Sequence, residues 1–574
     1  MKSIVSFLRL PLTILLIPLV VLPLAAQRRA VEAEHGMVAS ANALASAAGV
    51  EILRQGGNAV DAALATGFAL AVVHPSAGNL AGGGFMMIHL AAKNRQVFID
   101  YREAAPAVAS RDMYLAPDGS VMTGPTSGRL GWRASGVPGT IAGFADAFAK
   151  YGSGKVTWAQ IIEPARRLAA DGFVITGGLA AGMKQAAPLL GQFDESRRIY
   201  LHGGAGWKQG ELWRQPELAA TLVRLQKDGP REFYEGLTAQ RLAEAMRANG
   251  GTITLADLKA YRAIEREPLR QDYRGYEIVV PPPPSSGGIT ILQMLAMIEP
   301  FDVRAMGQDS AAKYHLFHEV MRRAFCDRIE YIGDPGFVDV PTRRLLDPAY
   351  LKSRMADYDP HKATPDGAIK PGLTAPHESR ETTQFSVVDA DGNAVSNTYT
   401  LRNGYGSGVT IPGVGVLMNN VMDDMAAKVG EYNQLGLMQG PANAIEAGKR
   451  PLSSMTPSLV FKNGKLLLVT GSPGGPTIIN TVFQVVTNVI DFQMPVAQAV
   501  EAPRVHHQWM PDQLEYEKYG MSADTVAALR AMGHTPVERS GYQGDAESIL
   551  IDPATGIRQG AADPRMPDSQ AVGF

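Results

Sequence analysis

Threonine and serine residues in the last third of the chain are the side chains best suited to covalent chemistry. A threonine hydroxyl is a weak nucleophile and needs a base beside it. That base can be the residue's own α-amine, with a pKa of about 8, when the threonine begins a chain. Thr382 lies where a segment rich in Pro, Gly, Thr, Lys and Asp (359–381) meets a predicted strand. Cleavage of the Glu381–Thr382 bond would create such a nucleophile, although Thr382 and Thr383 can equally be ordinary strand residues.

The turn that follows Thr382 predicts a second threonine opposite it. Residues 383–388 and 394–401 have strand patterns, and the turn Asp-Ala-Asp-Gly-Asn between them is centred on Asp391. An antiparallel hairpin with this centre pairs residues whose numbers add up to about 782. We therefore expect Thr400 to lie across from Thr382.

Other familiar catalytic motifs are absent from the sequence. No serine lies in a G-x-S-x-G frame, and no G-x-x-x-x-G-K-[ST] loop is present. The segment from His318 to Arg322 (HEVMR) has arginine where a zinc protease needs its second histidine. Cys326 lies in a predicted helix without a nearby base, and His506 and His507 would point apart on a strand. We therefore predict no metal and no cofactor.

The predicted elements alternate between helices and strands, which indicates an α/β fold. Residues 39–73 are crowded with small residues and predict one or two buried helices. The segment Pro281–Gly288 (PPPPSSGG) is either a boundary or part of a site. Further helices are predicted near 161–171, 216–225, 313–332, 476–490 and 523–532, and further strands near 85–90, 97–100, 415–418, 458–461 and 466–470.

The composition excludes several classes of protein. The 574 residues include 54 Lys plus Arg and 56 Asp plus Glu, a net charge of −2, so the chain lacks the basic excess typical of nucleic-acid binding. Hydrophobic residues make up 45%, an ordinary value for a globular chain and too low for a multi-span membrane protein. A single cysteine allows neither an internal disulfide nor a four-thiolate zinc site.

The first 26 residues have the layout of a secretory signal peptide. Lys2 and Arg9 precede an apolar run that ends at Leu24 and is followed by two alanines. An uncleaved membrane anchor is the alternative, but the run is short for a span and three prolines interrupt it. We therefore expect residues 1–26 to be removed and the remainder to be exported, periplasmic or secreted, with no stable membrane span.

Sequence blocks spread over nearly the whole chain after residue 26 resemble the γ-glutamyltranspeptidase family. The blocks are long and occur in order, which makes their joint match specific. They are Gly56–Ala62, Ala77–Met87, Asp100–Glu103, Val137–Thr140, Thr382–Asp389, Gly392–Val395, Thr398–Leu401, Met418–Asn420, Met422–Asp424, Arg450–Met455 and Gly471–Gly475.

This resemblance implies the fold of N-terminal-nucleophile hydrolases, a four-layer αββα sandwich. It also implies that the precursor cuts itself before Thr382 into a large subunit, 27–381, and a small subunit, 382–574. The two pieces would remain associated as a heterodimer within one intertwined domain. The implied substrates are glutathione and related γ-glutamyl compounds, whose acyl group passes to water or to an amino acid or dipeptide acceptor.

The same resemblance implies roles for individual residues. Thr382 would attack the γ-amide carbonyl to form an acyl-enzyme, and Thr400 would hold Thr382 by a hydrogen bond. Gly474 and Gly475 would donate backbone N–H groups to the oxyanion. The implied substrate-binding residues are Arg102, Ser453 and Ser454 for the α-carboxylate and Asp424 for the α-ammonium group.

Two positions depart from the family pattern. Arg402 stands where the family usually has asparagine, and Val421 stands where it commonly has glutamine or glutamate. Both positions normally help to hold the substrate amine. An inward-pointing arginine would repel an ammonium group, and valine offers it no acceptor. A shifted register in which neighbouring Asn403 takes the missing role is an alternative.

The residues are compatible with three functions. The first is an exported γ-glutamyl hydrolase and transferase. The second keeps the fold and nucleophile but acts on amides without an α-amine, such as glutaryl amides, which the altered amine site favours. The third is a non-catalytic exported binding homologue, which would remain one intact polypeptide.

Overall fold

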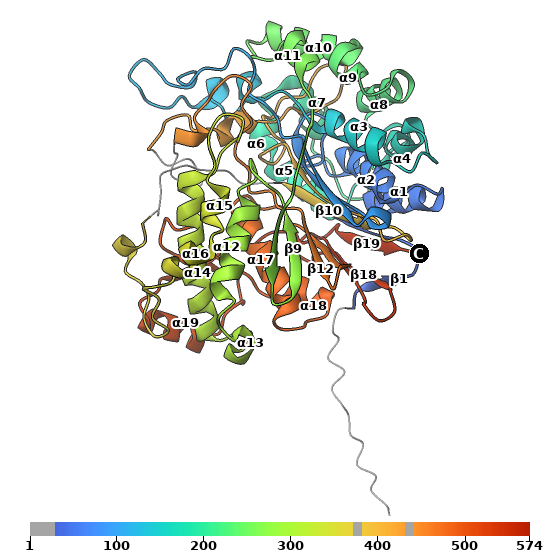
Figure 1. Ribbon diagram of the computed structural model, residues 1–574. Coiled ribbons are helices and arrows are strands. Elements are labelled where there is room, and N and C mark those ends of the chain that lie inside the picture. The colour runs from blue at the N-terminus through green and yellow to red at the C-terminus, as the bar shows by residue number, and fades with distance from the viewer. Residues whose placement is uncertain (1–28, 371–381, 431–440) are drawn as a thin grey trace, which may run out of the picture.

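Two seven-stranded sheets form the centre of the computed structural model, which describes residues 29–370, 382–430 and 441–574 (Figure 1). One sheet has the order β1 (Val31–Ala33), β18 (Arg558–Ala561), β17 (Ser548–Ile551), β13 (Lys465–Thr470), β12 (Ser458–Lys462), β9 (Tyr276–Val280) and β8 (Leu269–Tyr273). The other has the order β19 (Gln570–Gly573), β2 (Met37–Ser40), β10 (Thr383–Val388), β11 (Ala394–Thr400), β3 (Gly83–Leu90), β4 (Arg95–Asp100) and β7 (Ile264–Arg266). All their pairings are antiparallel.

Most of the predicted buried segment 39–73 forms two helices on the outer face of the β10 sheet, whereas its first two residues end strand β2. They are α1 (Ala43–Arg54) and α2 (Ala59–Val73), and α4 (Trp158–Asp171) packs on α2. Every residue of α2 is buried, and a Cβ at Gly67 would come within 2.5 Å of the Phe144 ring. The small residues therefore allow the close packing of these helices against their neighbours.

Helices also cover the outer face of the other sheet. α12 (Gly287–Ile298) contacts β8 and β9, and it packs against α14 (Ala311–Tyr331) and α17 (Thr477–Ile490). The two sheets face each other where β10 and β11 contact β13. Figure 1 shows the resulting layers, with α1 to α4 on one side of the strands and α12, α14 and α17 on the other. The predicted αββα sandwich is confirmed.

The remaining elements surround this sandwich. The helices are α3 (Thr140–Tyr151), α5 (Gly177–Gln185), α6 (Ala187–Leu190), α7 (Asp194–Tyr200), α8 (Pro216–Asp228), α9 (Glu232–Glu235), α10 (Leu237–Ala248), α11 (Leu255–Ala260), α13 (Val303–Met306), α15 (Thr342–Leu345), α16 (Pro348–Arg354), α18 (Val496–Glu501) and α19 (Ala523–Ala531). The small sheets contain β5 (Phe173–Val174) with β6 (Leu212–Trp213), and β14 (Val505–His506), β15 (Leu514–Tyr516) and β16 (Pro536–Glu538).

Each large sheet combines strands from before and after Thr382. In one sheet, β10 and β11 lie between β2 and β3; in the other, β12 pairs with β9. The two parts of the chain therefore share both sheets and cannot be separated into independent domains along the sequence.

The hairpin register agrees with the sequence-based prediction. Thr383 pairs with Tyr399 and Val388 with Ala394, so Thr400 at the end of β11 lies across from Thr382. The prediction of a strand at 415–418 is wrong. Leu417 and Met418 form only isolated bridges, because the chain here turns between loops instead of joining a sheet edge. The predicted signal segment 1–26 and Glu381 lie outside the described residues.

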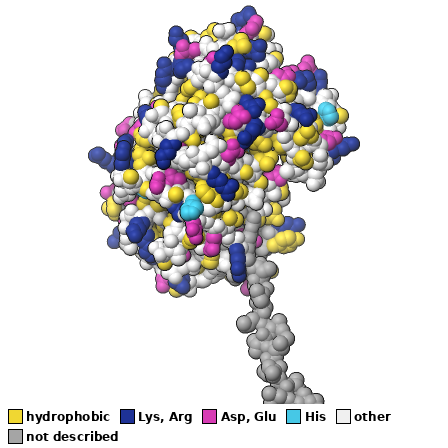
Figure 2. All heavy atoms as spheres, turned by 90° about the vertical axis from the view of Figure 1, so that its right-hand side faces the viewer, with side chains coloured by type: hydrophobic (Ala, Val, Ile, Leu, Met, Phe, Trp, Pro, Cys, Tyr) yellow, Lys and Arg dark blue, Asp and Glu magenta, His cyan; other side chains and the backbone are white. Residues whose placement is uncertain are grey.

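The surface agrees with the near-neutral charge of the sequence. On the face drawn in Figure 2, basic and acidic side chains are interspersed among apolar ones, without a continuous basic patch. Within the described ranges, no helix is both long enough and apolar enough to cross a bilayer.

Candidate active site

One small pocket collects most of the residues singled out from the sequence. The space in it that a water-sized molecule can occupy is about 10 Å³, the room of a single water molecule. It lies at the end of the sandwich where β10 begins and β11 ends. The lining residues are Arg102, Thr382, Thr400, Arg402, Asp424, Ser453, Ser454, Met455, Gly475 and Ile478.

Thr382 immediately precedes β10 and is half-buried in this pocket. Thr400 is buried across from it at the same open end of the hairpin, and its Oγ1 accepts a hydrogen bond of 2.7 Å from the backbone N–H of Arg402. The rigid ladder between β10 and β11 positions both threonines. The hydrogen bond expected between their side chains remains a prediction.

A buried set of charges lies beside the threonines. Arg102 follows β4, and its guanidinium group contacts Oδ2 of Asp424 and, over 3.1 Å, Oε2 of Glu103. Burial raises the pKa of Glu103 to about 7, although the Arg102 charge opposes the rise. The backbone of Asp424 is held in place, because Asn443 Nδ2 donates a hydrogen bond to its carbonyl oxygen over 2.6 Å. The sequence alone did not single out Asn443 or Glu103 as parts of this arrangement.

The two serines lie on a loop that a second loop supports. Ser285 forms a bridge with Ser453, and the Ser286 N–H donates to the Ser453 carbonyl over 2.7 Å. Arg328 of α14 donates to Ser286 Oγ over 2.9 Å and to Ser454 Oγ over 3.0 Å. The segment PPPPSSGG thus supports the pocket and marks no domain boundary. Its two serines were a usable signal in the sequence, whereas Arg328 gave none.

The two glycines lie where β13 leads into α17. Gly474 and Gly475 both have positive φ angles, 128° and 60°, which favour glycine. A Cβ at Gly474 would also come within 2.4 Å of Thr477 Oγ1. Gly475 lines the pocket, together with Ile478 from the first turn of α17. The N-terminal end of a 14-residue helix therefore lies next to the pocket, where its dipole favours negative charge.

Arg402 points into the pocket. Its Nε donates to Asp424 Oδ1 over 3.0 Å, and its Nη1 lies 2.6 Å from Asp423 Oδ2. Burial raises the pKa of Asp423, and the Arg402 charge opposes the rise. Val421 does not line the pocket: it is buried against Gly136, where an added Cβ would come within 2.5 Å of it. Asn403 likewise is not a lining residue, so Arg402 itself occupies the position.

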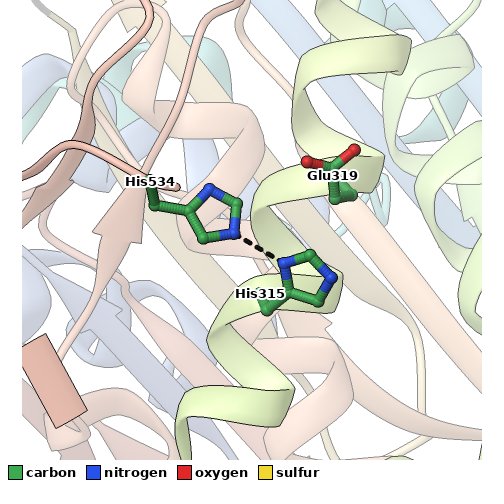
Figure 3. Close-up of side chains that lie close together, drawn as sticks. All are labelled: His315, Glu319 and His534. Atoms are coloured by element: carbon green, nitrogen blue, oxygen red, sulfur yellow. Dashed lines mark hydrogen bonds between the residues drawn. The ribbon is translucent and has the colours of Figure 1, made fainter. Parts of the chain in front are cut away.

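Within the described ranges, two groups away from the pocket bring metal-ligating side chains close together: His315, Glu319 and His534, and His318, His507 and Asp512. Figure 3 shows the rings of His315 and His534 facing each other, with Nδ1 and Nε2 2.6 Å apart, and Glu319 one turn along α14. His315 Nε2 bonds the Asp359 carbonyl over 2.7 Å. The Glu319 carboxylate accepts hydrogen bonds from two arginines and from the Thr364 N–H. Protein groups already engage both ring nitrogens of His315, His534 Nε2 and the Glu319 carboxylate, so we assign the His315 cluster a packing role; Nδ1 of His534 has no hydrogen-bond partner among the described residues.

A second histidine group adjoins this cluster. His507 Nε2 lies 2.9 Å from Asp512 Oδ1, which also pairs with Arg322 over 3.1 Å. His506 instead contacts Asn480 over 2.7 Å, so the adjacent histidines point apart, as the strand pattern predicts. Cys326 is buried, and burial raises the pKa of its thiol to about 12, which makes it a poor nucleophile.

The double-sheet sandwich, with a threonine beginning a central strand, defines an N-terminal-nucleophile hydrolase fold. The family model for gamma-glutamyltranspeptidase matches residues 45–573. Over 95% of this chain and 93% of the relative, the sequence is 47% identical to the glutathione hydrolase proenzyme of Escherichia coli (strain K12). It is 37% identical to the acylase ACY 1 proenzyme of Pseudomonas sp. (strain V22), with 93% of each chain covered.

A solved structure agrees with these matches. The cephalosporin acylase from Bacillus halodurans superposes with a TM-score of 0.84 at 28% identity, covering 98% of this chain and 99% of that one. The chain belongs to the gamma-glutamyltranspeptidase family.

Proposed function

We propose that the protein is a self-processing γ-glutamyl hydrolase and transferase that works through an acyl-enzyme on Thr382. The observation that carries this proposal is the shared pocket, in which Thr382 at the start of β10 meets Arg102, Asp424 and Gly475. The names of the relatives support glutathione and related γ-glutamyl compounds as substrates. We infer a large subunit of 27–381 and a small subunit of 382–574 that stay together as a heterodimer, since strands from both share each sheet.

Processing comes first in the proposed mechanism. Thr382 Oγ attacks the carbonyl carbon of Glu381, the peptide C–N bond breaks, and the new ester is hydrolysed by water. The products are a carboxylate on Glu381 and a free α-amine on Thr382. That amine is the base for catalysis, with an ordinary pKa of about 8. Export through the 1–26 segment would place the mature heterodimer in the periplasm or outside the cell.

Catalysis then repeats the attack on a substrate. The Thr382 amine accepts the proton of Oγ as Oγ adds to the γ-amide carbonyl, and the N–H groups of Gly474 and Gly475 stabilise the oxyanion. The proton passes to the leaving amine as the C–N bond breaks. Water or an amino-acid or dipeptide acceptor then attacks the ester and releases Thr382. Thr400 positions Thr382 from across the hairpin.

Substrate binding relies on the charges around the threonines. Arg102 and the hydroxyls of Ser453 and Ser454 hold the α-carboxylate of the donor, because guanidinium and hydroxyl groups donate to both carboxylate oxygens. Asp424 is the acidic residue in the lining of the pocket and faces the α-substituent in this proposal. No metal or other cofactor enters the proposed steps.

A denaturing gel with N-terminal sequencing of the purified protein tests the proposal. We expect two bands, with the smaller one beginning at Thr382, together with hydrolysis of a γ-glutamyl anilide. A single intact band without turnover would instead identify a non-catalytic binding homologue and overturn the proposal.

A further inference from the structure

We propose that Arg402 supplies a hydrogen-bond donor to one part of the pocket. In a bound substrate, this part contacts C2 of the acyl group. The preferred donors are then 5-amides of five-carbon dicarboxylic acids that carry a hydroxyl or keto oxygen at C2. This inference rests on the proposed function: the Thr382 nucleophile and the Arg102 clamp stay as described, and only the C2 substituent is assigned anew. γ-Glutamyl amides bind for turnover in the form whose α-amine is uncharged, because that amine can accept a hydrogen bond.

Guanidinium groups engage both oxygens of the Asp424 carboxylate. Arg102 contacts Oδ2, and Arg402 Nε donates to Oδ1 over 3.0 Å. The neighbouring carboxylate of Asp423 lies 2.6 Å from Arg402 Nη1. An incoming ammonium group would therefore meet a carboxylate whose charge two buried guanidinium groups already compensate.

The remaining nitrogen of the Arg402 side chain is a donor without an acceptor. Arg402 is 2% exposed, and its Nη2 has no hydrogen-bond partner in the part of the chain that the structure describes. A guanidinium group cannot accept a hydrogen bond, and neither can an ammonium group. A hydroxyl or keto oxygen can, and its bond to a charged donor is stronger than a neutral one. The unpaired nitrogen thus fits an oxygen substituent and opposes a positive one.

The backbone holds Arg402 in this orientation. Its φ angle is +83°, a conformation that side chains other than glycine rarely adopt, and its N–H donates to Thr400 Oγ1 over 2.7 Å. Val421 is buried against Gly136, does not line the pocket and offers no acceptor to a substituent. Of the two departures from the family pattern, only Arg402 lines the pocket, and it places a hydrogen-bond donor there.

Three 5-anilides that differ only at C2 test the inference: L-glutamyl, L-2-hydroxyglutaryl and glutaryl. We expect wild-type kcat/KM for the hydroxy compound to exceed that for each of the other two at least tenfold at neutral pH, mainly through KM. In Arg402→Asn, kcat/KM for the glutamyl anilide divided by kcat/KM for the 2-hydroxyglutaryl anilide should rise at least tenfold. Arg129→Gln is the matched control, because it removes a charge near Asp423 without removing a pocket residue, and it should leave the ratio unchanged.

A measurement on the wild type alone covers the case in which Arg402→Asn fails to fold. Free L-2-hydroxyglutarate should inhibit at least tenfold more strongly than free L-glutamate. Stronger inhibition by glutamate, or a wild-type preference for the glutamyl anilide that Arg402→Asn leaves unchanged, would overturn the inference and leave the proposed function intact. Failure of a self-processed chain to hydrolyse any of the three anilides would overturn both.

Discussion

Arg402 Nε and Asp424 Oδ1 lie 3.0 Å apart in a pair that is almost fully buried. Charges removed from water in this way are strongly interdependent, because removing one leaves the other uncompensated. The pair joins the end of the β10–β11 hairpin to the segment Val421–Asp424, so it links two walls of the pocket.

We predict that Asp424→Asn lowers the free energy of unfolding by about 3 kcal/mol, since it removes the negative charge that the buried guanidinium groups of Arg102 and Arg402 share. Adding Arg402→Gln should recover part of this loss. Chemical denaturation in a Thr382→Ala background, which keeps one uncut chain, measures the double-mutant cycle. The exposed pair Arg95–Glu265, at 2.8 Å, is the control and should couple by less than about 1 kcal/mol. Equal coupling in the two cycles would contradict the prediction.

Replacing Thr382 by alanine should abolish both self-cleavage and turnover, because the change removes the proposed nucleophile of both reactions. Thr383→Val provides a matched control. Thr383 is the next residue, is buried in β10, and its hydroxyl has no hydrogen-bond partner among the described residues. This variant should process and turn over at rates within about threefold of wild type. A gel and an anilide assay on both proteins suffice, and cleavage that persists in Thr382→Ala would refute the assignment.

The pKa of Glu103, about 7, predicts a specific dependence of stability on pH. Because burial raises this pKa above the usual 4.5, the folded chain binds more protons than the unfolded chain between these values. The contribution of Glu103 to the free energy of unfolding is therefore fully present below about pH 4.5 and is lost as the pH rises through about 7. The free energy of unfolding changes by about 3 kcal/mol over this range.

Glu103→Gln tests this dependence, since glutamine does not titrate. Both proteins carry Thr382→Ala, which keeps the chain uncut. The free energy of unfolding of the protein with Glu103 minus that of the Glu103→Gln variant should fall as the pH is raised from about 5 to about 8. Taking the difference cancels the contributions of other groups, including the buried histidines. A difference that stays constant or rises would show that Glu103 is ionised throughout.

Arg328→Lys should raise KM for the donor about tenfold with little change in kcat. A lysine ammonium cannot reproduce the two bonds that Arg328 makes to Ser286 Oγ and Ser454 Oγ, so the Ser454 hydroxyl loses its fixed position. Steady-state kinetics with a γ-glutamyl anilide measure both constants. Arg344→Lys, at an exposed position of α15, is the control. An unchanged KM in Arg328→Lys would exclude a supporting role for this arginine.

Several features could be predicted from local sequence because local geometry determines them. The turn around Asp391 sets the register of the hairpin, and the strands on either side alternate in phase, so Thr400 had to lie across from Thr382. The small residues of 39–73 predicted buried helices, which α1 and α2 confirm. The strand predicted at 415–418 failed because its short apolar run lies in a loop with no sheet edge to join.

The sequence by itself determined the class of fold, the hairpin and the candidate nucleophile, since each depends on neighbours along the chain or on a long ordered resemblance. Only the tertiary structure decided how Arg402 is used. Its side-chain direction depends on Asp423 and Asp424, about twenty residues away, and on the conformation of its own backbone. The support of Ser454 by Arg328 likewise joins residues 126 positions apart. Such contacts follow from the packing of distant elements, which no local pattern specifies.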